Sequence, residues 1–203
     1  MPIDPTREQN PANKEQPWNP IYRYAYVSDA VEGLIVVDVT RLGDRGPQNN
    51  FRERAAQFNP DGALDGAEYI TVAGNYAYIL CKRGLQIVSI ADPLAPRIVA
   101  TLGAPAINEG HAVAIQFRYA FITDADGLKV VDVTWPEKPA LKATLPMAET
   151  HDVYVARTYA YIGAGSQGVA IVDVTKPEKP KLFQMFNGDG VINDAHAVRV
   201  GAT

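Results

Sequence analysis

The sequence predicts an all-β fold built from repeated units of four short strands. The first observation is an eight-residue stretch that occurs four times in the 203 residues, at 33–40, 84–91, 127–134 and 168–175. The copy at 127–134 reads GLKVVDVT, and the other copies keep its leading glycine and its apolar run. Successive copies begin 51, 43 and 41 residues apart, a spacing typical of repeat architectures. We therefore expect one continuous array of repeats.

The second observation is that the same segments surround each copy. An aromatic segment precedes it, as at 119–122, and its alternation puts both rings on one face of a strand. A proline turn follows it, as at 135–139, and a further apolar segment follows that turn. One more segment precedes each aromatic one, as at 111–115 and 151–155. Four strands in forty-odd residues make one blade of a β-propeller.

Two details indicate how each blade forms. Every recurring stretch begins with glycine because the last position of a tight turn often needs a positive φ. The apolar residues that follow run almost unbroken, which is typical of a strand covered on both faces. Asp38, Asp132 and Asp173 precede a turn, and each is expected to cap it by accepting backbone N–H groups.

The copies resemble the LVIVD repeat, a family of propeller-type repeats in bacterial and archaeal surface or secreted proteins. The motif that names the family stands here at 35–39, 130–133 and 171–174, and the resemblance covers residues 23–200. The second copy departs from the motif, with Ser89 in place of the aspartate. The resemblance implies an extracellular, cell-surface or periplasmic setting. Repeats of this family resemble modules found beside redox or haem domains. The resemblance therefore implies a redox or multihaem subunit as one class of partner for this chain.

The chain divides into an extended, proline-rich arm over 1–20 and the propeller repeats over 21–203. The arm holds prolines at 2, 5, 11, 17 and 20 and has almost no apolar residue before Trp18, so little burial offsets its ordering entropy. The first blade carries an insertion at about 41–67. Within it, residues 50–58 have the spacing of two helical turns, with Phe51, Ala55 and Phe58 on one face.

The two ends of the array leave its closure open. The array starts in the aromatic strand of its first blade and stops after the opening strand of a fifth, at 196–200. A last strand that completes the first blade would close a four-bladed ring and remove its open sheet edges. Part of a larger propeller, and a ring formed by two chains, also agree with the repeats.

Composition excludes several classes of partner. A net charge of -4 and a pI near 5.4 provide no basic surface for nucleic acid or an anionic membrane. No apolar run is long enough to span a membrane, and the first residues do not resemble a signal peptide. The single cysteine, Cys81, lies in a predicted strand and is expected to be buried.

All three histidines occupy one position of the repeat. His111 and His151 stand eight residues before an aromatic segment, Glu68 stands at the same position in an earlier copy, and His196 follows in the last. Because the opening strand of a blade is its innermost, these side chains are expected to converge on the central channel. They could bind zinc, iron or copper, with acidic residues two positions earlier as second-shell partners. Those acidic residues are Glu109, Glu149 and Asp194.

A structural role explains the same histidines. A residue repeated in every blade is typical of the hydrogen bonds that tie one blade to the next, and we favour this interpretation. The segment 124–127 resembles the start of a calcium loop but lacks its later ligands, so a hairpin turn explains it. No nucleophile elbow and no phosphate-binding glycine loop occurs.

The sequence therefore favours a binding protein over an enzyme. We expect a non-catalytic propeller that acts as a protein-interaction or scaffolding subunit of a larger surface or periplasmic assembly, with no cofactor. The alternative is a metal-binding protein or metalloenzyme that uses Glu68, His111, His151 and His196 at the central channel.

Overall fold

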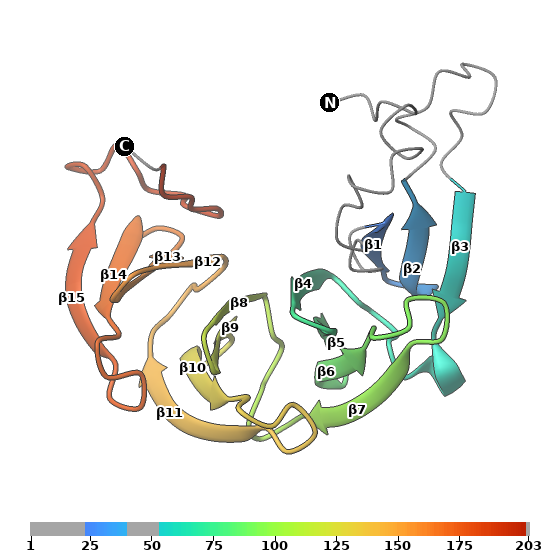
Figure 1. The fold of residues 1–203 in the computed structure, drawn as a ribbon. Helices are drawn as coiled ribbons and strands as arrows, with labels where there is room; N and C mark the ends of the chain where they lie inside the picture. The colour runs from blue at the N-terminus through green and yellow to red at the C-terminus, as the bar shows by residue number, and fades with distance from the viewer. Residues whose placement is uncertain (1–22, 40–52, 202–203) are drawn as a thin grey trace, which may run out of the picture.

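The strands form four antiparallel sheets that follow one another along an arc (Figure 1). The computed structural model describes residues 23–39 and 53–201. We call the sheets blades 1 to 4 in chain order. Blade 1 contains β1 (Tyr24–Asp29), β2 (Gly33–Asp38) and β3 (Glu53–Phe58). Blade 2 contains β4 (Tyr69–Ala73), β5 (Tyr76–Cys81), β6 (Gly84–Ser89) and β7 (Arg97–Leu102).

The other two blades repeat this order from the inner strand to the outer one. Blade 3 contains β8 (Ala112–Gln116), β9 (Tyr119–Asp124), β10 (Gly127–Asp132) and β11 (Ala140–Pro146). Blade 4 contains β12 (Val153–Ala156), β13 (Tyr159–Gly163), β14 (Val169–Asp173) and β15 (Lys181–Phe186). The predicted all-β propeller fold is confirmed. Among the described residues, blades 1 and 4 stand at opposite ends of an open arc, so closure into a four-bladed ring is not shown (Figure 1).

The glycine that opens each recurring strand has the predicted positive φ. At Gly33, Gly84, Gly127 and Gly168, φ is 78°, 94°, 132° and 83°. The outermost strand of the blade also ends against each of these glycines. A β-carbon at Gly127 would lie 2.4 Å from the carbonyl oxygen of Leu145, closer than any real contact. Glycine is therefore required both by the backbone conformation and by the close approach of the next strand.

The predicted aspartate caps are present at Asp132 and Asp173, whereas the turn after Asp38 lies outside the described residues. The Asp132 carboxylate accepts hydrogen bonds from the backbone N–H and the hydroxyl of Thr134, and these bonds lower the pKa of Asp132. Asp173 accepts the N–H of Thr175 at 2.8 Å in the same way. Asp38 pairs with Arg23 at 3.0 Å. Cys81 is buried, as expected.

The core consists of apolar layers between successive blades. We call the side of a blade that looks toward the next blade its forward face, and the opposite side its rear face. The forward face of blade 2 presents Tyr78, Leu85 and Ile87, which pack against the rear face of blade 3. The same repeat positions pack blade 1 on blade 2 and blade 3 on blade 4. The unbroken apolar run therefore serves both faces of one strand, as predicted.

Hydrogen bonds between side chains also join the blades. The Tyr76 hydroxyl in blade 2 donates to Glu137 of the proline turn in blade 3, at 2.8 Å. The Tyr119 hydroxyl in blade 3 donates to Glu178 of the proline turn in blade 4, at 3.1 Å. This recurring bond fixes blade 2 to the turn of blade 3, and blade 3 to the turn of blade 4.

The prediction of a helix over 50–58 is wrong for residues 53–58, which are the part of this segment that the structure describes. Residues 53–58 form β3, the outermost strand of blade 1, and pair with β2 from Leu34↔Phe58 to Asp38↔Glu53. The open edge of β2 needs backbone partners, and this pairing outweighs a weak helical pattern. A short 3-10 turn, η4 (Pro60–Gly62), follows. The predicted arm over 1–20 and residues 41–52 of the insertion lie outside the described residues.

The prediction of a strand at 196–200 is also wrong, because these residues form no strand. Their neighbourhood forms only one isolated bridge, between Ala195 and Gly165, and the segment lies against blade 4 instead of completing blade 1. The Val198 backbone N–H donates to the Asp152 carboxylate instead of to a neighbouring strand.

Candidate functional site

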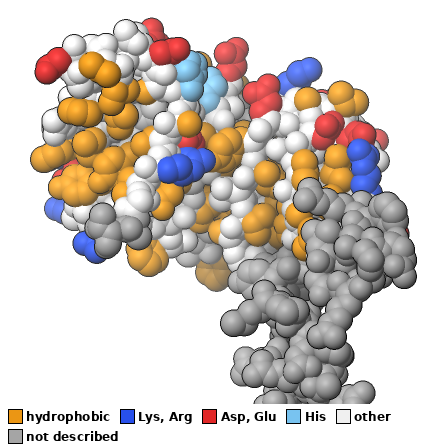
Figure 2. Space-filling model, turned by 90° about the horizontal axis from the view of Figure 1, so that it is seen from above, with side chains coloured by type: hydrophobic (Ala, Val, Ile, Leu, Met, Phe, Trp, Pro, Cys, Tyr) orange, Lys and Arg blue, Asp and Glu red, His pale blue; other side chains and the backbone are white. Residues whose placement is uncertain are grey.

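The repeated histidine position lies on the concave, inner side of the arc. Glu68 precedes β4, His111 precedes β8 and His151 stands two residues before β12, while His196 comes from the C-terminal segment. All four side chains line one hollow of about 410 Å³, together with Tyr69, Asp152 and Arg199. Figure 2 shows the histidines together on the face seen from above. The structure thus brings the four predicted residues to one surface.

The His151 ring stands next to both of the other imidazoles. The ring centroids of His111 and His151 are 6.1 Å apart, and those of His151 and His196 are 4.1 Å apart. His111 Nδ1 lies 2.5 Å from the carbonyl oxygen of Thr150. Because a carbonyl oxygen only accepts, this Nδ1 carries the proton and donates it. The bond ties blade 3 to the chain that enters blade 4, as expected for a histidine with a structural role.

The acidic partners expected beside the histidines are realised unevenly. Asp194 Oδ1 lies 2.8 Å from His196 Nε2. Glu149 instead accepts hydrogen bonds from the backbone N–H and the hydroxyl of Ser166, at 2.8 and 2.5 Å, so the expected bond to His151 is not formed. Glu149 acts on His151 only through its charge.

Asp152 is a member of the hollow that the sequence did not reveal. Its side chain is buried, and it accepts the backbone N–H of Val153 at 2.9 Å and that of Val198 at 3.1 Å. It also binds the Arg199 guanidinium, whose pKa is raised by this bond, and the Tyr69 hydroxyl at 3.5 Å. Asp152 therefore joins blade 4, the C-terminal segment and blade 2. The sequence feature that could have revealed Asp152 is its carboxylate within an apolar strand pattern, because a buried carboxylate requires hydrogen-bond partners.

The pKa of His151 is lowered, first by burial and then by the charges of His196 and His111, while Asp194 and Glu149 act in the opposite direction. The folded protein therefore binds this proton less readily than the unfolded chain, whose histidine has a pKa near 6.5. We expect the free energy of unfolding contributed by this group to be complete above pH 6.5 and to fall as the pH drops below it. Urea denaturation between pH 5 and 8 measures this loss. The His151→Gln variant should show a smaller fall, and an identical fall would contradict the assignment to His151.

The side chains of the hollow are not arranged as a set of metal ligands among the described residues. Within residues 23–39 and 53–201, no three His, Cys, Asp or Glu side chains stand around one point as ligands of an ion. In the same residues, no helix is long and apolar enough to cross a membrane.

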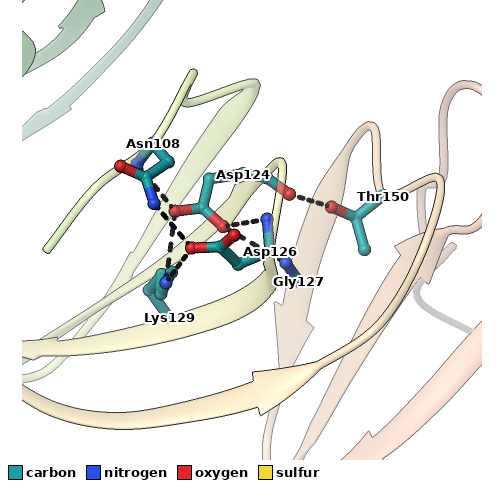
Figure 3. A network of polar contacts seen from close by, with 6 residues as sticks. All are labelled: Asn108, Asp124, Asp126, Gly127, Lys129 and Thr150. Carbon is teal, nitrogen blue, oxygen red and sulfur yellow. Dashed lines mark hydrogen bonds and ion pairs between the residues drawn. The ribbon is translucent and has the colours of Figure 1, made fainter. Parts of the chain in front are cut away.

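A second polar cluster lies inside blade 3 (Figure 3). Asp124 and Lys129 are 1% and 4% exposed, and the Lys129 ammonium lies 3.6 Å from Asp124 and 2.8 Å from Asp126. Asp124 also accepts the backbone N–H groups of Asn108, Asp126 and Gly127. The Thr150 hydroxyl donates to the Asp124 carbonyl at 2.8 Å, which connects the cluster to blade 4. The predicted hairpin at 124–127 is confirmed, and its carboxylates hold a buried lysine rather than form a calcium loop.

Burial differs between the inner blades and the end of the arc. Tyr78, Leu85 and Ile87 on the forward face of blade 2 are at most 3% exposed, and Phe121, Leu128 and Val130 on that of blade 3 at most 1%. The same repeat positions in blade 4 are Tyr161, Val169 and Ile171, and all are partly exposed. The forward face of blade 4 therefore carries the interface residues of an inner blade, but the described residues cover it less completely.

The rear face of blade 1 shows the converse. Its Val27 is 44% exposed and Ala25 is exposed as well. The matching pairs in the other blades are 0% exposed. These pairs are Ala77 and Ile79, Ala120 and Ile122, and Ala160 and Ile162. At both ends of the arc, some positions that the inner blades bury are thus exposed in full or in part, although Ile35 beside Val27 is buried.

Solved structures support the fold. The computationally designed protein Ika8 is similar, with a TM-score of 0.62 and 12% identity, over 89% of this chain and 50% of that one. A chain in the crystal structure of a nidogen/laminin complex is similar with a TM-score of 0.58 and 13% identity, over 86% of this chain and 63% of that one. This chain thus spans half to under two thirds of the chains it matches. No curated protein matches it.

A family model described as the LVIVD repeat matches at four places, residues 23–41, 66–102, 110–145 and 148–187. These segments make up more than half of the 203 residues and coincide with the four blades. The aromatic strand, the glycine turn and the recurring apolar strand lie in each of them. The chain therefore belongs to the LVIVD repeat family.

Proposed function

We propose that this chain is a non-catalytic interaction module that binds another protein through the forward face of blade 4. The observation that carries the proposal is that Tyr161, Val169 and Ile171 are partly exposed, whereas the same positions in blades 2 and 3 are buried. A contiguous apolar face of this kind is typical of a binding surface. The complementary partner has small and β-branched side chains at alternate positions of a sheet, as the rear faces of blades 2 to 4 have.

The setting of this module is a further part of the proposal. The family resemblance supports an extracellular, cell-surface or periplasmic assembly, in which a redox or multihaem subunit is one class of partner. An array of blades with an exposed aromatic turn residue such as Trp135, at 71%, suits a scaffolding role.

A photo-crosslinking residue at position 161 tests the proposal. In the full chain, produced in its native setting, a photoreactive phenylalanine in place of Tyr161 should give one defined adduct, identified by mass spectrometry. The matched control carries the same residue at Phe117, which is exposed but lies in a turn away from the face. Adducts at Phe117 and none at Tyr161 would contradict the proposal.

A second candidate function is binding of a zinc, iron or copper ion by His111, His151 and His196 with Glu68. It is favoured by the ring separations of 6.1 and 4.1 Å, since three imidazoles on one tetrahedral ion have centroids about 5 Å apart. His111 also donates Nδ1–H to a carbonyl, which leaves Nε2 as the ligand atom. Small side-chain rotations would be needed to bring the three rings around one point.

Titration with zinc, followed by calorimetry, tests this second candidate. Wild-type protein should bind about one zinc ion per chain, and His151→Gln should weaken the affinity at least tenfold. The Glu149→Gln variant is the control because Glu149 is bonded to Ser166. Equal heats for wild type and His151→Gln would rule the site out.

A further inference from the structure

We propose that two copies of this chain join head to tail, with blade 4 of each copy against blade 1 of the other. This inference rests on the proposed function and names the partner as a second copy. Residues 196–200 of each copy would pair with β1 of the other as its missing inner strand. The contact would close two open arcs into one ring.

The first argument is continuity with interfaces already present in the chain. Within the chain, the forward face of one blade always packs on the rear face of the next, through the same repeat positions. Blade 4 exposes a forward face with Tyr161, Val169 and Ile171, and blade 1 exposes a rear face with Ala25 and Val27. A second copy therefore supplies the surface that fits each open end, and one interface satisfies both.

The second argument comes from the edge of β1. In blades 2, 3 and 4 the aromatic strand pairs on both sides. On one side lies the glycine-led strand, β6, β10 or β14, and on the other lies an inner strand, β4, β8 or β12. In blade 1 the sheet order is β1-β2-β3, so β1 is the edge strand among the described residues. An unpaired edge of this kind is a template for a strand from another chain.

The third argument is that the C-terminal segment already stands where that inner strand would begin. The His196 ring lies beside the His151 ring. The His151 ring in turn lies beside that of His111, which belongs to the preceding blade. Residues 196–200 read HAVRV, close to HAVAI at 111–115, which leads into β8. In β8, Val113 pairs with Ile122 of β9. By the same register, Val198 of one copy would pair with Val27 of the other.

The hydrogen bond between blades supports the same direction of docking. Tyr76 and Tyr119 each donate to a glutamate in the turn of the following blade. Tyr159 holds this position in blade 4, and its ring meets the Phe183 ring edge-on, at 5.6 Å between centroids. Among the described residues, blade 4 has no following blade whose turn could accept the same bond.

Sedimentation velocity and native mass spectrometry of the full chain test this proposal. The wild type should have a mass about twice 22.0 kDa. Ile171→Glu and Val27→Glu should each be monomeric, because each variant places a charge in both junctions of its own ring. Mixing the two variants should restore a dimer, since one copy keeps an intact forward face and the other an intact rear face. Phe117→Glu is the control and should remain dimeric, because Phe117 lies outside both faces.

The outcomes separate this inference from the proposed function. A wild type that stays monomeric, a dimer that survives Ile171→Glu, or a mixture that stays monomeric would each overturn the inference. If the monomer still forms an adduct with a different protein from position 161, the proposed function stands without it. Circular dichroism of Ile171→Glu and Val27→Glu checks that each variant folds, and restoration by mixing excludes misfolding as the cause.

Discussion

Replacing Gly127 with alanine is expected to destabilise the chain by about 3 kcal/mol or more, from backbone strain and overpacking together. Its φ of 132° lies in a region that residues with a β-carbon rarely adopt. The new β-carbon would also lie 2.4 Å from the Leu145 carbonyl oxygen and 2.5 Å from the Met147 nitrogen. Both neighbours are backbone atoms, so β10 and the end of β11 must separate for the methyl group to fit. The free energy of unfolding from urea denaturation measures the loss.

Gly74→Ala is the matched control for this prediction. Gly74 also has a positive φ, 56°, but nothing lies within 4 Å of a β-carbon built there. This variant should cost only about 1 kcal/mol, the penalty of the left-handed conformation alone. Equal losses for the two variants would show that the close approach of the strands does not matter.

Replacing Asp124 with alanine is expected to cost about 3 to 5 kcal/mol, as for a buried ion pair that loses one partner. Three backbone N–H groups lose their acceptor, and the buried Lys129 ammonium loses one of its two carboxylates (Figure 3). Because Asp124 and Lys129 are both buried, water cannot replace these bonds without opening the hairpin. Urea denaturation of the variant again gives the free energy of unfolding.

Asp132→Ala provides the comparison within the same blade. Asp132 makes a similar turn with Thr134, but its bonds face solvent, so its loss should cost about 1 kcal/mol. A double-mutant cycle of Asp124→Ala with Lys129→Met should give a coupling energy of at least about 1 kcal/mol. Additive losses would mean that the lysine and the carboxylate do not stabilise each other.

The repeat made most of the fold predictable. Glycine stands at 33, 84, 127 and 168, and the apolar run after each one predicts a hairpin followed by a strand with apolar residues on both faces. Local chemistry also predicted the caps at Asp132 and Asp173. These features depend on a few neighbouring residues, which a sequence displays directly.

Predictions failed where a distant partner decides the outcome. Residues 53–58 have a weak helical spacing, but the open edge of β2 makes them a strand. Residues 196–200 have a strand pattern, but the Val198 N–H bonds to the distant Asp152 carboxylate and the segment forms no ladder. Periodicity reports which face of an element is apolar and does not report which neighbour is present.

The candidate site was predictable in position and not in detail. The shared repeat position placed Glu68 and the three histidines on one surface. The bond from His111 to Thr150 spans 39 residues, and the contacts of Asp152 with Val198 and Arg199 span 46 and 47. Such pairs follow from the curvature of the arc, which no local pattern specifies.

Hydroxyl-radical footprinting of the native assembly tests the central claim most directly, namely that the forward face of blade 4 is a protein interface. Tyr161 should be protected in the native protein relative to Phe117, whose side chain is 94% exposed. Dilution, or the Ile171→Glu substitution, should raise the reactivity of Tyr161 and leave that of Phe117 unchanged. Reactivity of Tyr161 that is already high in the native assembly, and constant on dilution, would contradict the claim.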